Sequence, residues 1–205
     1  GGRAGEYCFL IPCATLGMMF MSSGVDLITL FIGLETMAIA FYILAGFLKP
    51  SERSNEAAVK YFLLGAFSLG LLLYGMSLLY GATGTTSLNG IAAALASGER
   101  SLVLILALIL IGAGMGFKIA AVPFHMWAPD VYEGAPTPIT AFLSVASKAA
   151  GFAVVLRVFN TALDLPIISV EWSIVFAVMS ACSMTIGNLI AIRQKDIKRL
   201  LEIGR

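Results

Sequence analysis

Six apolar stretches, each near the roughly 20 residues that a helix needs to cross a lipid bilayer, occupy most of this chain. We place them at about residues 6–22, 25–48, 56–80, 101–122, 137–159 and 170–192. Only 12% of the 205 residues are charged, whereas soluble domains carry about 25%. The sequence therefore predicts an all-α integral membrane protein, a polytopic helix bundle that forms one transmembrane domain over residues 1–205.

A proline interrupts the fourth stretch. The apolar run over residues 101–128 is too long for one straight crossing, and Pro123 falls inside it. Because proline removes a helix hydrogen bond and clashes with the preceding turn, we expect a break near Val122, followed by a short segment through Trp127. Such a break persists in a membrane only where protein or a watery cavity surrounds it. Lys118 lies about one turn earlier, and we hypothesise that carbonyl groups freed by the break hold its ammonium.

Basic residues near the ends of the stretches predict the orientation. Lys and Arg gather on the cytoplasmic side of membrane proteins. Two of them, Arg100 and Arg157, fall on one side. The other side, which we predict to be cytoplasmic, holds seven: Arg3, Lys49, Arg53, Arg193, Lys195, Lys198 and Arg199.

Four charged side chains lie inside the stretches. Glu35 is about ten residues into the second one and Lys148 about eleven into the fifth. A charge at the centre of a membrane helix costs about 2.5 to 3.5 kcal/mol, so it usually marks an ion or proton path. Glu35 is either a proton-accepting or lysine-pairing group or a structural carboxylate. Lys148 is either a proton carrier or a side chain that extends to the interface. Extension to the interface alone would explain Lys60, and the depth of Lys118 depends on where its helix breaks.

Several classes of site are not expected. The chain has one histidine, His125, which we interpret as bonded to local carbonyl groups, and three cysteines without a CxxC pair. No GxGxxG follows a strand pattern. We therefore expect no metal site and no bound cofactor. With 13 basic and 12 acidic residues, the balanced charge gives no footprint for nucleic acid.

Three segments carry a resemblance to a known family. They are FIGLE with Glu35, AVKYFLLGAF with Lys60, and GFKIAAVPFHMWAPDVYEGAPTPITAFLSVASKAAGF with Lys118 and Lys148. Together they resemble the antiporter-type membrane subunits of NADH-quinone oxidoreductase, respiratory complex I, and among these the subunit N family. The runs LLYGATGTTSL and NLIAIRQKDIKRLL strengthen the resemblance to subunit N.

The resemblance implies a proton-translocating subunit that contains no redox centre. Glu35 would pair with Lys118, and Lys60 and Lys148 would continue a hydrated line of protonatable groups. NADH, FMN, iron-sulfur clusters and quinone would be bound by partner subunits, and other complex I membrane subunits and the lipid bilayer would surround this chain. It would be a multi-pass protein of the bacterial cytoplasmic membrane. Family chains are longer, so we expect a fragment that holds one half of an inverted-repeat, antiporter-like fold.

Two other functions remain open. The chain could belong to a multisubunit sodium/proton antiporter, which shares this lineage, or it could be a structural spacer in the membrane arm that conducts no ions. The sequence does not decide between protons and sodium as the carried ion.

Overall fold

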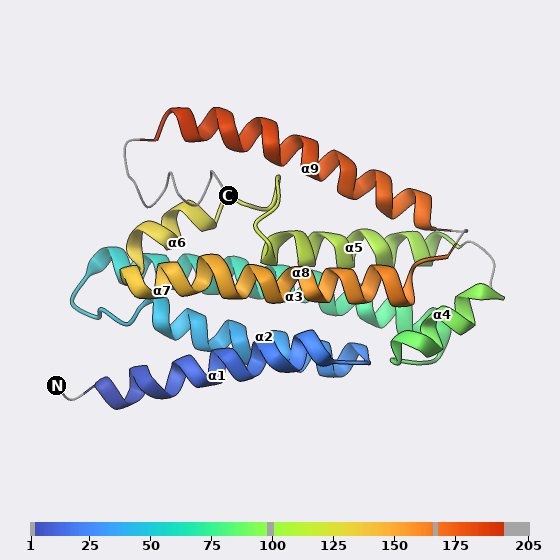
Figure 1. Ribbon diagram of the computed structural model, residues 1–205, viewed down its shortest axis with the longest axis horizontal. Coiled ribbons are helices and arrows are strands. Elements are labelled where there is room, and N and C mark those ends of the chain that lie inside the picture. Colours follow the sequence, from blue (N-terminus) through green and yellow to red (C-terminus); the bar gives the residue numbers. More distant parts are fainter. Residues whose placement is uncertain (1–2, 98–100, 166–167, 195–205) are drawn as a thin grey trace.

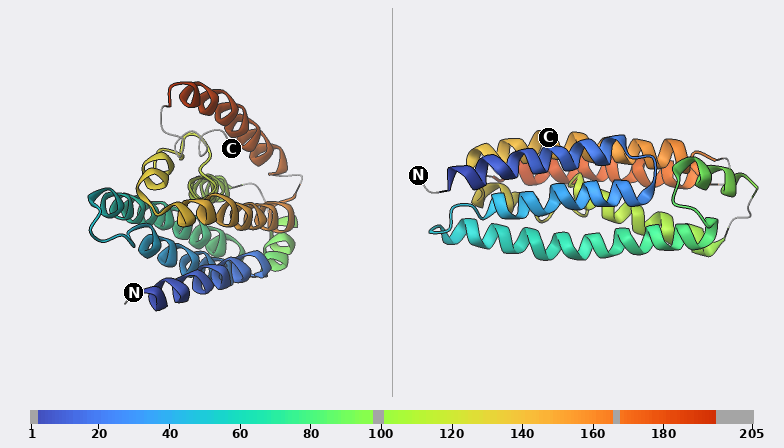
Figure 2. Two further views of the ribbon diagram at one scale, coloured as in Figure 1. Left: turned by 60° about the vertical axis from the view of Figure 1, so that its left-hand side comes forward. Right: turned by 90° about the horizontal axis from the view of Figure 1, so that it is seen from below.

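The computed structural model describes residues 3–97, 101–165 and 168–194 (Figure 1). All the regular elements within these ranges are helices, and the β-bridge between Asp26 and Ser87 is an isolated contact. The long helices run back and forth along the longest axis, and α9 crosses them at an angle (Figures 1 and 2). The all-α prediction is confirmed.

The helices follow one another with short connections, and one long rod contains two π-helical turns, η1 and η2. In chain order the elements are α1 (Ala4–Ser23), α2 (Leu27–Ala45), α3 (Glu52–Thr83), α4 (Leu88–Ala96), α5 (Leu102–Lys118), α6 (Ala128–Gly134), α7 (Thr137–Phe142), η1 (Leu143–Ser147), α8 (Lys148–Arg157), η2 (Val158–Ala162) and α9 (Ser169–Ile192). The rod comprises α7, η1, α8 and η2.

Within the described chain, five helical segments are long and apolar enough to cross a membrane. They are α1, α2, α3, the rod, and the part of α9 from Trp172 to Ile192. The shorter α5 is also apolar. These six segments overlap the six predicted stretches. Helix α3 is longer than the predicted 56–80, and α5 ends at Lys118, before the predicted 122. The short helix α4 lies between the third and fourth predicted stretches. The assignment of residues 1–205 to one domain stays a prediction.

The predicted orientation is tested only in part. The antiparallel order places Lys49 and Arg53 at the end where α2 meets α3, and Arg157 near the opposite end, where its guanidinium donates to the Gly24 carbonyl over 3.1 Å. The predicted residues Arg100, Lys195, Lys198 and Arg199 lie outside the described residues. The cytoplasmic assignment therefore stays a prediction.

Helices α1 and α2 pack with their backbones almost in contact. A Cβ atom added to Gly33 would lie 2.9 Å from the Gly17 carbonyl oxygen and 3.0 Å from the Met21 Cα, and Gly17 is equally close to α2 at Met37. Small residues at such a crossing let membrane helices approach closely, which is how packing gains van der Waals contact in lipid. This contact fixes the position of α2, which carries Glu35.

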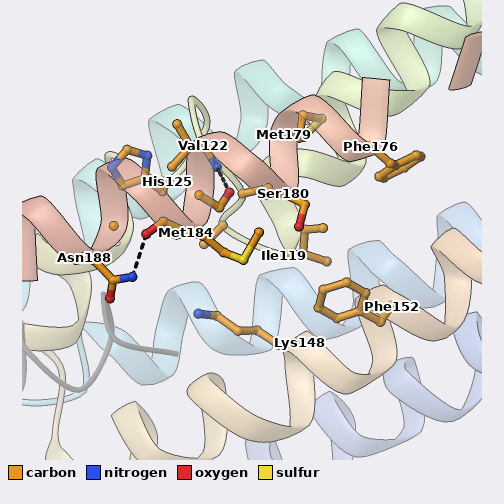
Figure 3. A pocket seen from close by; sticks show the side chains of 14 residues that line it. Ile119, Val122, His125, Lys148, Phe152, Phe176, Met179, Ser180, Met184 and Asn188 are labelled. Carbon is orange, nitrogen blue, oxygen red and sulfur yellow. Dashed lines mark hydrogen bonds between the residues drawn. The ribbon is translucent and has the colours of Figure 1, made fainter. Parts of the chain in front are cut away.

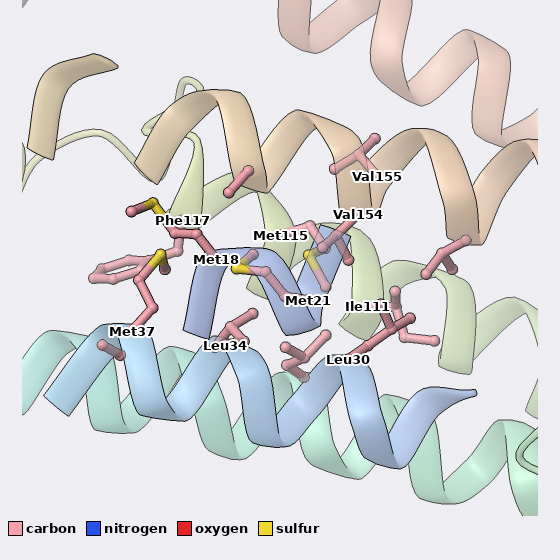
Figure 4. Close-up of a cluster of buried hydrophobic side chains, with 14 of the residues drawn as sticks. Met18, Met21, Leu30, Leu34, Met37, Ile111, Met115, Phe117, Val154 and Val155 are labelled. Atoms are coloured by element: carbon pink, nitrogen blue, oxygen red, sulfur yellow. The ribbon is translucent and has the colours of Figure 1, made fainter. Parts of the chain in front are cut away.

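The apolar core lies where α1 and α2 meet α5 and α8 (Figure 4). Methionine side chains of α1, α2 and α5 and branched side chains of α2, α5 and α8 fill it. Its labelled members in Figure 4 are Met18, Met21, Leu30, Leu34, Met37, Ile111, Met115, Phe117, Val154 and Val155.

Asp26 caps α2. Its carboxylate accepts hydrogen bonds from the Thr29 backbone N–H at 2.9 Å and from the Thr29 hydroxyl at 2.7 Å. These bonds favour the ionised form and hold the pKa of the Asp26 carboxyl below its ordinary value of 3.8. Beside the cap, Leu27 donates to the Thr86 carbonyl and Leu88 donates to the Val25 carbonyl. The start of α2 is therefore bonded to the start of α4.

Candidate functional site

Helix α5 ends at Lys118, and no regular helix follows until Ala128. Ala120 has a φ of +55°, and the bond between Val122 and Pro123 is cis. The predicted break is confirmed, although it begins about one turn earlier than expected, and the helix after it, α6, lies beyond the segment that the sequence predicted. The Ser183 hydroxyl of α9 accepts a hydrogen bond from the Val122 N–H at 3.0 Å. A side chain of α9, distant in the sequence, therefore stabilises the backbone of the break.

The carbonyl groups freed by the break do not hold Lys118, contrary to our hypothesis. Ala121 donates to the Gly116 carbonyl at 2.8 Å, and the Trp127 indole donates to the Phe117 carbonyl at 3.0 Å. The Lys118 ammonium has no hydrogen-bond partner among the described residues. The carbonyls of Gly116 and Phe117 are thus bonded by groups that follow closely in the chain, the Ala121 N–H and the Trp127 indole. The Lys118 side chain points away from them.

Lys118 instead faces Glu35 and Tyr42 of α2. Glu35 is the ninth of the 19 residues of α2, so it lies at the middle of that helix. Lys118 is only 6% exposed, and its charge and that of Glu35 influence one another. The two do not form an ion pair in the described structure, and Glu35 Oε1 is buried without a hydrogen-bond partner there. The Lys118 Nζ lies 5.8 Å from the centre of the Tyr42 ring.

Lys148 lies at the start of α8, directly after η1, and lines a cavity of about 410 Å³. The cavity is lined by residues of the break, α8 and α9. Figure 3 shows Lys148 and Phe152 on one side of it and Ser180, Met184 and Asn188 of α9 on the other. The Lys148 Nζ also lies 5.7 Å from the centre of the Tyr132 ring.

His125 lines the same cavity. Its Nδ1 is buried and has no hydrogen-bond partner within the described ranges, so our interpretation of a histidine bonded to local carbonyls is wrong for this nitrogen. The backbone around it is taken up by the turn, in which Ala128 donates to the His125 carbonyl. The cavity thus holds two titratable side chains, from the break and from α8.

Lys60 has partners that the sequence analysis did not foresee. Its Nζ lies 2.7 Å from Glu56 Oε1 on α3 and 2.8 Å from Asp130 Oδ2 on α6. Arg53 and Glu133 form a second contact between the same helices at 3.6 Å. The Lys60 side chain is 43% exposed, which agrees with a position near the end of the bundle. Asp130 itself belongs to the short helix α6.

The structure thus brings Glu35 and Lys118 together, places Lys148 at an adjacent cavity, and binds Lys60 to carboxylates of α3 and α6. The sequence analysis missed Tyr42 and Tyr132, whose rings face the two lysines. A tyrosine seven residues after Glu35, and so on the same face of α2, was the available signal for Tyr42. Within the described ranges no group of three or more His, Cys, Asp and Glu side chains could hold a metal ion.

Comparison with known proteins decides the family. The family model described as NADH:quinone oxidoreductase/Mrp antiporter, transmembrane, matches residues 24–203 of this chain. The chain belongs to this family. The match includes all four charged residues singled out from the sequence. The assignment confirms the resemblance inferred from the segments around Glu35, Lys60, Lys118 and Lys148.

Two relatives in this family are similar to almost the whole of this chain. NADH-quinone oxidoreductase subunit N 2 of Solibacter usitatus is 54% identical over 204 residues, which are 98% of this chain and 41% of that protein. Subunit N of Trichlorobacter lovleyi is 51% identical over 199 residues, 96% of this chain and 40% of that protein. The chain therefore spans about 40% of the length of the curated relatives it matches.

Solved structures of the family share the fold. A chain of respiratory complex I from Thermus thermophilus with bound aureothin matches with a TM-score of 0.81 and 41% identity, over 95% of this chain and 41% of that one. A chain of the Mrp complex from Dietzia sp. matches with a TM-score of 0.82 over 95% of this chain and 36% of that one, and at 23% identity it supports the fold alone. The antiporter-like fold is confirmed.

Proposed function

We propose that this chain is part of a proton-translocating membrane subunit of NADH-quinone oxidoreductase, of the subunit N type. The observation that carries the proposal is the buried Lys118 ammonium, which lies opposite the Glu35 carboxylate without a hydrogen bond among the described residues. Burying an unpaired charge is costly, so such a group persists where its ionisation is used. The similarity to proteins named subunit N supports the oxidoreductase as the host complex.

The proposed step is a change in the separation of Glu35 and Lys118. When the two side chains approach, the carboxylate favours the charged ammonium; when they separate, burial disfavours it, and the proton moves towards Lys148. A change of one pKa unit corresponds to about 1.4 kcal/mol. Moving one charge through 100 mV takes about 2.3 kcal/mol. A modest rearrangement of one buried pair therefore has the right scale of energy to drive a proton against a membrane potential.

The cavity beside Lys148 supports the next part of the path. A volume of about 410 Å³ has room for several water molecules, and polar side chains line it from three directions. His125 contributes from the break, Lys148 from α8, and Ser180 and Asn188 from α9 (Figure 3). We propose that this cavity is hydrated in the membrane and that Lys148 receives the proton there.

We propose that Lys60 takes part near the cytoplasmic end of the same path. Its contacts with Glu56 and Asp130 would let a proton be exchanged among three groups that face an opening of about 180 Å³. This would place a protonatable cluster where α3 and α6 meet, on the side that the basic residues predict to be cytoplasmic.

The remaining assignments follow from the host complex. The chain would act in a translocating enzyme without holding a redox centre of its own, and NADH, FMN, iron-sulfur clusters and quinone would be bound by partner subunits. Its neighbours would be other membrane subunits of complex I and lipid, with no nucleic acid. The relatives quoted are bacterial, which supports the bacterial cytoplasmic membrane as its location.

The test is proton pumping by the intact complex in sealed inverted membrane vesicles. Lys118→Ala and Glu35→Ala should each lower the number of protons pumped per NADH oxidised, while Lys49→Ala, in the exposed turn between α2 and α3, should not. Undiminished pumping in both Lys118 and Glu35 variants would reject the proposal and would favour the structural spacer.

A sodium/proton antiporter is the second candidate, because the family description includes Mrp antiporters and the Dietzia chain shares the fold. Sodium-dependent proton movement that needs no NADH would favour it. Co-purification of the protein with NADH-quinone reductase activity would exclude it.

A further inference from the structure

Lys118, which is buried, and Lys148, which is partly exposed, each lie over the ring of a tyrosine. The Lys118 ammonium is 5.8 Å from the Tyr42 ring centre, and the Lys148 ammonium is 5.7 Å from the Tyr132 ring centre. Both distances are within the range of cation–π attraction, about 6 Å, which is strongest where water is excluded. The position of each ring therefore affects how well its lysine is stabilised as a cation.

The two tyrosine rings are linked through two further aromatic side chains. Tyr42 meets Tyr61 edge to face at 4.7 Å, Tyr61 stacks on Trp127 at 4.7 Å with only 8° between the planes, and Trp127 meets Tyr132 edge to face at 6.2 Å. All four are buried. A continuous aromatic chain thus extends from the ring beside Lys118 to the ring beside Lys148.

Trp127 occupies the decisive position in this aromatic chain. Its indole N–H donates to the carbonyl of Phe117, the residue before Lys118, and its ring stacks on that of Phe117 at 5.2 Å. It is 3% exposed and stands at the junction between the break and α6. A single side chain is therefore bonded to the backbone beside one lysine and packed against the ring that faces the other.

Packing around Tyr42 restricts how the aromatic chain can move. A Cβ at Gly65 of α3 would overlap the Tyr42 hydroxyl, so the glycine provides the space that this hydroxyl occupies. Closely packed interiors change between discrete arrangements and do not deform continuously. A displacement of Trp127 would therefore shift the rings on both sides of it together.

We infer that Trp127 is a positioning residue that couples the Lys118 and Lys148 sites, so that a movement of the break changes both ammonium environments at once. The inference rests on the proposed proton-translocating function. It adds that the two lysines do not respond independently, because Trp127 contacts the surroundings of each. A tryptophan that merely filled space in the core would affect stability and leave the pH response of pumping unchanged.

The test compares Trp127→Phe with Trp172→Phe in the intact complex. Trp172 is a matched control, because its indole also donates to a backbone carbonyl, that of Leu163, at 3.0 Å, and its ring also packs against other aromatic rings. The readout is the ratio of proton pumping to NADH oxidation in sealed vesicles, measured across pH. Trp127→Phe should move the midpoint of this profile by about one pH unit, a tenfold change in proton affinity. Trp172→Phe should leave the midpoint in place.

A double variant tests the coupling itself. If Trp127 couples the two lysines, the loss of pumping in Trp127→Phe together with Lys148→Met should be smaller than the sum of the losses in the two single variants. Additive losses, or an unmoved midpoint in Trp127→Phe, would overturn the inference. If the complex with Trp127→Phe does not assemble, the same measurement is made on Tyr61→Leu, which removes the ring between Tyr42 and Trp127. Tyr61→Phe, which keeps that ring, is its control. Normal pumping in Lys118→Ala would contradict the proposed function. Loss of pumping in Lys118→Ala, together with an unchanged pH midpoint in Trp127→Phe, would contradict only the coupling.

Discussion

Replacing Gly33 with alanine tests whether close contact between α1 and α2 positions Glu35. The new methyl group would lie 2.9 Å from the Gly17 carbonyl oxygen and 3.0 Å from the Met21 Cα. Both atoms belong to the backbone of α1, so no side-chain rotation can relieve the overlap, and the two helices must separate. Glu35 lies two residues further along α2 and would move with it.

The expected cost can be worked from opposing effects. Overpacking in a closely packed core costs about 1–3 kcal/mol. Alanine in a helix interior returns about 1 kcal/mol relative to glycine. Because the new methyl group overlaps backbone atoms of α1, we place the cost at the upper end of this range. The expected net loss of stability is about 2 kcal/mol.

The assay is thermal inactivation of NADH-driven pumping in native membranes, with Gly112→Ala as the matched control. Gly112 lies buried within α5, yet a Cβ there would meet nothing within 4 Å. We expect Gly33→Ala to lower the melting temperature and the pumping ratio, and Gly112→Ala to leave both unchanged or to raise stability slightly. Equal stability of the two variants would show that α1 and α2 are not in contact at Gly33, which would refute the reasoning.

Three further predictions concern the contacts around the site. Asp130→Asn should weaken the attachment of α6 to α3, because it removes the negative charge that lies beside the Lys60 ammonium. The expected result is faster proteolysis near the break, and an unchanged rate of cleavage would contradict the prediction. Asp26→Ala should cost about 1 kcal/mol as a lost helix cap. Because the folded pKa of Asp26 is lowered, its contribution is complete above the ordinary pKa and is lost as the pH falls through the folded value, so Asp26→Asn should flatten the acid end of a melting-temperature profile. Ser183→Ala should cost about 1–3 kcal/mol by leaving the Val122 N–H unpaired, and a melting temperature equal to that of Ser180→Ala would contradict this.

The membrane helices and the break could be predicted because hydropathy and proline act locally. Apolar runs of sufficient length gave the spans, and Pro123 indicated the break. Helix α4 was missed because its nine residues, LNGIAAALA, are too few for a crossing and follow a turn-rich segment. The break begins at Lys118 and not at Val122 because Ala120 adopts a left-handed conformation, which no pattern in the sequence indicated.

The site was only partly predictable because its contacts join distant parts of the chain. The depth of Glu35 and Lys148 indicated function, since a charge in an apolar helix is costly wherever it points. Which groups they meet depends on packing. The stack of Tyr61 on Trp127 joins residues 66 positions apart, and the contact of Lys60 with Asp130 joins residues 70 apart. Neither leaves a periodic signal in a single sequence.

The π-helical turn η1 ends at Ser147, one residue before Lys148. A π turn holds about one residue more than an α turn, and one residue corresponds to about 100° of rotation around the axis. Every side chain after η1 is thus turned by that angle relative to an uninterrupted α-helix starting at Thr137. The direction of the Lys148 amine is consequently set by a surplus residue upstream of it. If the 143–147 segment formed ordinary α-helix without losing a residue, the lysine, its charge and its helix would remain, but the amine would point at a different neighbour; deleting one residue as well would restore its present direction.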